Sequence, residues 1–176
     1  MESITSQRVD TVDCAKLIRR DLARHFPGIK FSVRSSRYSG GSSIDVGWTD
    51  GPTTKQVSPI AKRYQGASFD GMTDMKEYHE DLVLQPDGIV KTVHYGADYV
   101  FSTRSYSQPD AFRETIAKRC CADFDGLTYE PGWGNLRWGN DWLSSIVECI
   151  LSAVDFRTMS PETVPLIKDS MINGRI

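Results

Sequence analysis

Three cationic side chains recur at four-residue steps near the start of the chain: Lys16, Arg20 and Arg24. On a helix this spacing places them in one stripe. Such a stripe is typical of phosphate contacts and equally of a solvated helix face, which is the simpler interpretation. Neighbouring residues would extend a nucleic-acid surface, because a tyrosine ring stacks on an unpaired base. The whole candidate set is Lys16, Arg20, Arg24, Arg34, Arg37 and Tyr38.

Residues 35–42, Ser-Ser-Arg-Tyr-Ser-Gly-Gly-Ser, combine hydroxyl groups with two glycines. Glycines at positive φ leave backbone N–H groups free, and such groups bind phosphate. The segment lacks the G-x-x-x-x-G-K-[ST] pattern and does not lead into a helix. We therefore expect a plain hairpin turn, with an anion-binding loop as the alternative.

A catalytic interpretation would begin at His94, with Asp98 and either Ser102 or Ser105 on the next strand. Nucleophilic catalysis needs a base within hydrogen-bond reach of the nucleophile. The chain has no nucleophile elbow, no H-E-x-x-H motif and no Walker signature. A hydrolase or transferase is therefore the third hypothesis for function, after two binding hypotheses.

Metal chemistry would fall to Asp70, Asp74 and Glu77, whose spacing does not match a calcium-binding loop. Residues 70–87 hold six acids and one lysine, which is typical of an exposed loop. The cysteines have no C-x-x-C spacing, so we expect free thiols, no metal and no cofactor. They are Cys14, Cys120, Cys121 and Cys149.

Glycines separate three large rings in residues 126–142, and these rings are candidates for partner binding: Tyr129, Trp133 and Trp138. Tryptophan is enriched both in cores and at binding hot spots. Glycines flank Trp133 on both sides. We therefore expect Trp133 to anchor a partner and Trp138 to close the core.

The helices and strands that must position these residues follow from hydrophobic periodicity and from capping and turn residues. Asp10 is expected to cap the first helix and Asp141 the last. The order α-β-β-α-β-β-α with a further C-terminal helix predicts an α+β fold, with a mainly antiparallel four-stranded sheet packed by helices. The predicted elements are a helix at 11–26, a hairpin of strands 30–37 and 43–48, a helix at 53–64, a hairpin at 88–107, a helix at 109–122 and a final helix from 141.

The chain has 176 residues, which fits an α+β domain at 1–125 with the segment 126–176 packed on it. Its longest apolar stretch, 142–156, is too polar to cross a bilayer, and its start lacks a secretion signal. We expect a cytoplasmic protein. Residues 1–64 carry eleven Lys and Arg against six Asp and Glu, whereas residues 65–176 carry ten against seventeen. This asymmetry favours a binding role only weakly, because salt screens distant charges.

Three segments resemble a known family: FPGIKFSVRSSRYSGGSSIDVGWTDGPTTKQV, YQGASFDGMTDMKEY and HYGADYVFSTRSYS. Over roughly residues 9–125 the chain is similar to the large polyvalent protein associated domain, type 29. The resemblance implies an origin on a phage or conjugative element and a role in its conflict with the host. It implies no catalytic residue.

The leading hypothesis is therefore a non-catalytic accessory protein that binds a host protein and blocks or redirects it, for example a restriction or CRISPR defence component. The alternative is a module that binds DNA or RNA through the basic N-terminal residues. We expect no membrane partner, and the oligomeric state is left open.

Overall fold

The computed structural model describes residues 6–72, 74–84 and 90–166, which form two compact units. The first unit runs to Trp48 and resumes at Thr54–Ser105. The second unit contains Thr49–Thr53 and everything from Tyr106 onward. Each unit has its own apolar core. The described residues include no helix with the length and apolar character that crossing a membrane requires.

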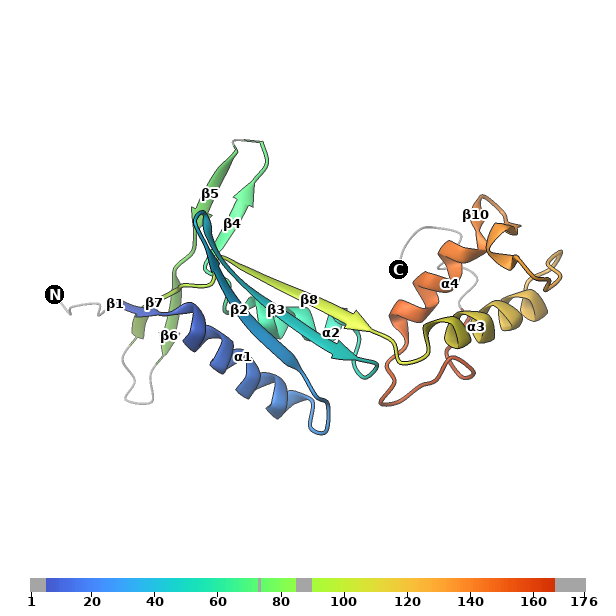
Figure 1. The fold of residues 1–176 in the computed structure, drawn as a ribbon, viewed down its shortest axis with the longest axis horizontal. Helices are drawn as coiled ribbons and strands as arrows, with labels where there is room; N and C mark the ends of the chain where they lie inside the picture. Colours follow the sequence, from blue (N-terminus) through green and yellow to red (C-terminus); the bar gives the residue numbers. More distant parts are fainter. Residues whose placement is uncertain (1–5, 73, 85–89, 167–176) are drawn as a thin grey trace. The chain divides into compact units, whose positions relative to one another are not determined.

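The first unit is built on a three-stranded sheet in the order β2-β3-β8. Strands β2 (Ser32–Tyr38) and β3 (Gly41–Thr49) form the predicted antiparallel hairpin. Strand β8 (Tyr99–Ser105) lies on the other side of β3 and runs in the same direction (Figure 1). Two contacts agree with this direction: Ser42 bonds to Asp98, and Gly47 lies beside the carbonyl of Thr103.

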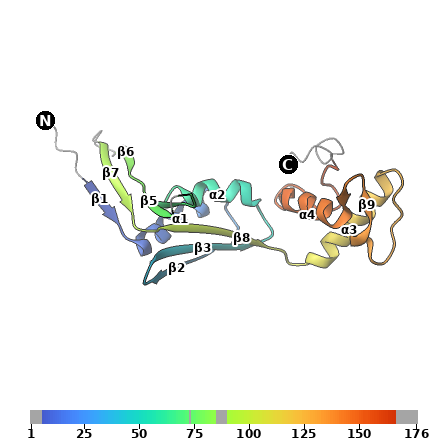
Figure 2. The same cartoon turned by 90° about the horizontal axis from the view of Figure 1, so that it is seen from above.

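Helices α1 (Thr11–His25) and α2 (Thr54–Lys62) cover one face of this sheet (Figure 2). Both were predicted, and α2 keeps Pro59 inside its span. Their apolar faces pack on alternate residues of β3. The most completely buried side chains of this core are those of Ile18, Leu22, Ile44, Val46 and Val57. The opposite face of the sheet carries the other set of alternating residues.

A second sheet has the order β1-β7-β6. In it, β1 (Ser6–Val9) is parallel to β7 (Val90–Tyr95), and β6 (Asp81–Leu84) is antiparallel to β7. The predicted hairpin at 88–107 is therefore wrong, because β7 and β8 belong to different sheets. The chain leaves β7 at Gly96, whose N–H donates to the carbonyl of Val9 at 2.8 Å. The single four-stranded antiparallel sheet is wrong for the same reason, although the α+β class is confirmed.

Strands β4 (Ala67–Asp70) and β5 (Met75–Tyr78) form a separate two-stranded ribbon. Over the residues that the structure describes, the expected exposure of the acidic segment 70–87 is confirmed, but the expected loop is wrong, because β5 and β6 lie within it. The strand β6 is Asp-Leu-Val-Leu, and such a short apolar run supports extended backbone. The side chains of Phe69, Met75 and Tyr78 are all more than half exposed on the ribbon.

The second unit packs α3 (Pro109–Asp123) against α4 (Leu143–Ala153). Between them lie the 3-10 turn η1 (Trp133–Asn135) and the short strands β9 (Arg137–Trp138) and β10 (Asp141–Trp142). Both helices were predicted. Trp142 rather than Asp141 precedes the first turn of α4, and no side chain caps that turn. The helix α3, assigned from the sequence to the first 125 residues, shares the core of α4.

Candidate functional site

No described helix of the first unit packs on the second face of the β2-β3-β8 sheet, which we name the open sheet face. Its members follow from strand alternation, because the residues that alternate with them include Val33, Ile44, Val46 and Val100, which point into the core. Cross-strand register confirms the pairing on this face, for example Arg34 opposite Asp45 and Tyr38 opposite Gly41. The open sheet face consists of Ser32, Arg34, Ser36, Tyr38, Gly41, Ser43, Asp45, Gly47, Tyr99, Phe101 and Thr103, of which Ser43 is buried.

Aromatic rings dominate the open sheet face. Tyr99 and Phe101 are two residues apart on β8, with ring centroids 6.3 Å apart and planes inclined by 25°. Phe101 is 53% exposed and Tyr38 is 52% exposed. An exposed aromatic ring is a large apolar surface with a π-face open to stacking. The two exposed rings and the half-buried ring of Tyr99 lie on one face that no described helix of this unit covers, and they therefore form a platform for flat, aromatic or apolar groups.

Lys76 of the ribbon lies near both the ring of Tyr99 and that of Tyr78. Its Nζ lies 5.7 Å from the ring centroid of Tyr99 and 5.1 Å from that of Tyr78. It also forms an ion pair with Asp98 at 2.7 Å. Burial disfavours the charge of Lys76, but interactions with Asp98 and then Tyr78 outweigh it, so the pKa of Lys76 lies above its ordinary value. The ribbon is thereby attached to the edge of the platform.

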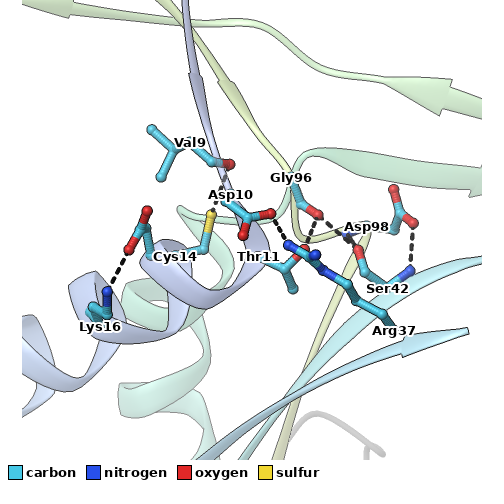
Figure 3. A network of polar contacts seen from close by, with 10 residues as sticks. Val9, Asp10, Thr11, Cys14, Lys16, Arg37, Ser42, Gly96 and Asp98 are labelled. Carbon is cyan, nitrogen blue, oxygen red and sulfur yellow. Dashed lines mark hydrogen bonds and ion pairs between the residues drawn. The ribbon is translucent and has the colours of Figure 1, made fainter.

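A polar network fixes Asp98 (Figure 3). The carbonyl of Gly96 accepts hydrogen bonds from Oγ1 of Thr11 at 2.6 Å and from Oγ of Ser42 at 2.7 Å. The N–H of Ser42 donates to the carboxylate of Asp98 at 2.7 Å, and the N–H of Asp98 donates back to Oγ of Ser42. The start of α1, the β2–β3 turn and the link from β7 to β8 are thus held together.

The carboxylate of Asp98 lies at the β2–β3 turn, where the sequence suggested that a phosphate could bind. Residues 35–38 and 41–42 belong to strands, so the turn itself is short. A Cβ at Gly41 would lie 2.4 Å from Oδ2 of Asp98, which explains the glycine there. The N–H of the following residue, Ser42, already has this carboxylate as its acceptor. The plain hairpin is confirmed, and the geometry gives the anion-binding alternative no support.

The structure separates the six candidate nucleic-acid residues. Arg34 and Tyr38 lie on the open sheet face. Arg37 points to the other face and pairs with Asp10. Asp10 is the N-cap residue of α1, as predicted, but its side chain makes no capping hydrogen bond. The three cations of α1 lie on the exposed side of that helix. Of these, Lys16 pairs with Asp13 at 2.7 Å and Arg20 with Asp21 at 3.6 Å; Arg24 is exposed.

The candidate partner-binding rings lie in the second unit, half-buried against its core. Trp138 stacks on Phe124 with centroids 4.3 Å apart. Tyr129 donates to Oε1 of Glu114 at 3.0 Å. Trp133 packs against the same core, and the most exposed tryptophan of the segment is Trp142, at 47%. Partner binding by these rings stays a prediction.

The structure does not assemble the candidate catalytic groups into a nucleophile–base pair. His94 lies 3.8 Å from Glu80, and Asp98 is engaged by Ser42 and Lys76. The hydroxyl of Ser102 is buried and has no hydrogen-bond partner among the described residues, so no base activates it. Asp70 accepts the N–H of Met72 at 2.9 Å in a turn. In the part of the chain that the structure describes, no three His, Cys, Asp or Glu side chains form a metal-binding group.

The four cysteines are free in the structure, and two of them, Cys14 and Cys120, are buried. Burial raises the pKa of Cys14, and it raises the pKa of Cys120 to about 12. A thiol with a raised pKa carries little thiolate at neutral pH. Neither of these two thiols is an activated nucleophile.

Tyr99, Phe101, Asp45 and Lys76 were not identified from the sequence. Alternation in residues 99–105 already placed Tyr99 and Phe101 on the same side of a strand. The missing information was the neighbour of that strand, since only the order β2-β3-β8 brings these rings onto the face of Arg34 and Tyr38.

Comparison with known proteins gives one match. A family model described as large polyvalent protein associated domain 29 matches residues 9–107, which comprise the open sheet face, the ribbon and the network around Asp98. No curated protein and no solved structure is similar enough to the chain to match it. Because the matched residues make up more than half of its length, the chain belongs to the family of the large polyvalent protein associated domain 29.

Proposed function

We propose that the chain is a non-catalytic accessory module that binds single-stranded nucleic acid on the open sheet face. One observation carries this proposal: Tyr38, Tyr99 and Phe101 project from the same uncovered face of one sheet. Base stacking on aromatic rings contributes about 1–3 kcal/mol per base and tolerates any sequence. Proteins that bind single strands on a sheet use rings placed in this way.

Charge supports an anionic ligand for the first unit. Its described residues carry fourteen Lys and Arg against ten Asp and Glu, whereas those of the second unit carry five against ten. Arg34 lies on the same sheet face as the rings and offers a guanidinium to a phosphate. The family associates the chain with phages and other mobile elements, which expose single strands when they transfer or replicate DNA.

Stacking on a platform requires bases that are not paired. In a duplex the base faces are covered by their neighbours, so exposed rings gain nothing without unstacking the helix. We therefore expect single strands to bind more tightly than duplexes of the same sequence. Double-stranded DNA would contact the unit only through phosphates, and that binding would decline steeply with salt.

Fluorescence anisotropy with labelled single and double strands, at low and high salt, tests this proposal. Phe101→Ala should weaken single-strand binding about tenfold, and Tyr38→Ala should act in the same direction. Trp142→Ala is the matched control, because it removes an aromatic ring of similar exposure from the second unit. An unchanged affinity of the Phe101→Ala protein, or binding to duplex alone, contradicts the platform.

A second candidate is the blocking or redirecting of a host protein, such as a restriction or CRISPR component. Large apolar side chains outside the open sheet face favour it: Met72 is 97% exposed, Leu82 is 73% exposed and Leu84 is 69% exposed. Exposed apolar surface of this kind is typical of docking sites for proteins. Affinity capture from host lysate should then lose a specific protein on Leu82→Ser with Leu84→Ser, while Tyr38→Ala retains it.

A further inference from the structure

A single carboxylate lies in the middle of the open sheet face. Asp45 is exposed on β3, the central strand of the β2-β3-β8 sheet. On β2 it is directly opposite Arg34, and along β3 its neighbours on the same face are Ser43 and Gly47. The side chains on either side of it in sequence, Ile44 and Val46, are buried in the core. The direction of Asp45 is therefore fixed by the strand that bears it.

The negative charge of Asp45 and its lack of a hydrogen-bond donor determine which groups of a nucleic acid it can contact. An ionised carboxylate only accepts hydrogen bonds and repels a phosphate. On a surface that stacks bases, it must therefore face the edge of a base rather than the backbone. Guanine presents two adjacent donors on its Watson–Crick edge, N1–H and the N2 amino group, which match the two carboxylate oxygens. Cytosine and adenine present one amino group, and thymine and uracil present a single N3–H.

The residue beside Asp45 leaves room for such a base. A Cβ at Gly47 would meet its nearest atom, the carbonyl oxygen of Thr103, at 3.9 Å, which is an ordinary contact. The glycine is therefore not needed for strand packing. Its effect on the open sheet face is to leave the surface next to Asp45 without a side chain. A flat base stacked on the neighbouring rings can bring its edge to the carboxylate there.

From this arrangement we infer that Asp45 is a specificity-determining residue, which recognises guanine in a bound single strand through its two Watson–Crick donors. The inference rests on the proposed function, because it needs the open sheet face to bind nucleic acid. It goes further in naming the base and the group that reads it. Arg34, directly across from Asp45, is then available to the phosphate of the same strand.

The test compares short oligothymidines that differ at one central position, measured by anisotropy with the full chain. The strand with a central guanine should bind about tenfold more tightly than the strand with thymine throughout. Inosine at the same position, which lacks the N2 amino group, should lose most of this preference. Asp45→Asn should bring all these strands to within about threefold of one another while binding to the all-thymine strand is kept or strengthened, because the repelling charge is gone.

The last result separates recognition from misfolding, since a misfolded variant would lose binding to every strand. Equal binding of the guanine, inosine and thymine strands by the unmodified chain overturns the inference and leaves the proposed function intact. A guanine preference that survives Asp45→Asn also overturns it. Failure to bind any strand overturns the proposed function itself. The same series in RNA, with uridine as the background, shows whether the sugar alters the preference.

Discussion

Lys76 and Asp98 form an ion pair of 2.7 Å in which the two side chains are only 20% and 13% exposed. The pair joins the β4–β5 ribbon to the link between β7 and β8. Asp98 is in turn held by the N–H of Ser42, and Lys76 lies against the ring of Tyr99. One contact therefore connects the ribbon, the β2–β3 turn and the edge of the open sheet face.

Asp98→Ala should lower the free energy of unfolding by about 2 kcal/mol, because it leaves a mostly buried ammonium and the N–H of Ser42 without their acceptor. Asp13→Ala removes a carboxylate from an ion pair with more than half of each side chain exposed, and should cost less than about 1 kcal/mol. Urea denaturation of the two variants measures both losses. Equal losses would show that the Lys76–Asp98 pair contributes no more than a surface pair.

Alkaline pH should destabilise the first unit through Tyr64. Burial, together with Asp21, which accepts the hydrogen bond of the hydroxyl, raises the pKa of Tyr64 to about 12. In the unfolded chain this hydroxyl ionises near pH 10. The folded state holds the proton to higher pH, so this contribution is complete below pH 10 and is lost between about pH 10 and 12. Integrated over this range it is about 2–3 kcal/mol.

Tyr64→Phe removes this titrating group. Urea melts between pH 8 and pH 11 should therefore show a shallower alkaline decline for this variant than for the unmodified chain. Tyr95, whose pKa burial also raises, contributes in the same direction and remains in both proteins. The same decline in both proteins would mean that Tyr64 does not hold its proton more tightly when folded.

Two glycines of the first unit should respond oppositely to alanine. A Cβ at Gly66 would lie 1.7 Å from the carbonyl oxygen of Tyr95. This oxygen belongs to the backbone, so it cannot move away without distorting the strand. Gly66→Ala should cost about 4 kcal/mol or prevent folding. Gly47→Ala meets only ordinary contacts and should be neutral or stabilise by up to about 1 kcal/mol. Thermal melts decide this, and a stable Gly66→Ala protein would refute the close approach of the two segments.

Trp138→Ala should lower the free energy of unfolding by about 2–3 kcal/mol, because it removes a half-buried ring stacked on Phe124. Trp142→Ala, at 47% exposure, should cost less than about 1 kcal/mol. Trp133→Ala tests the partner-anchor hypothesis in the same thermal melts. A stability loss as large as that of Trp138→Ala would contradict that hypothesis, whereas unchanged stability with reduced partner binding would support it.

Local patterns predicted the helices well. The apolar steps from Ala15 to Phe26 and from Leu143 to Val154 identify α1 and α4 without tertiary information, although Val12, which fits the first pattern, is exposed. The β2–β3 hairpin followed from alternation around Gly40 and Gly41. Strand partners were harder, because pairing depends on residues far apart in sequence. The separation of β7 from β8 is set by close backbone contacts at Gly66 and Gly96, and no periodicity reveals such contacts.

The candidate site shows the same limit. Arg34 and Tyr38 were identified from residue type and proximity in the chain. Asp45 is opposite Arg34 through the hairpin register, yet its exposure depends on both helices packing on the other face. Phe101 joins them only through the placement of β8 beside β3. Residue type thus predicted part of the site, and the topology supplied the rest.

Photo-cross-linking tests the central claim most directly. A single strand carrying 5-iodouracil is irradiated in complex with the chain, and the modified peptides are mapped by mass spectrometry. Because this base forms adducts with rings on which it stacks, the account predicts adducts at Tyr38, Tyr99 or Phe101. Adducts confined to residues 16–24 of α1, or to the second unit, would contradict the open sheet face as the binding platform.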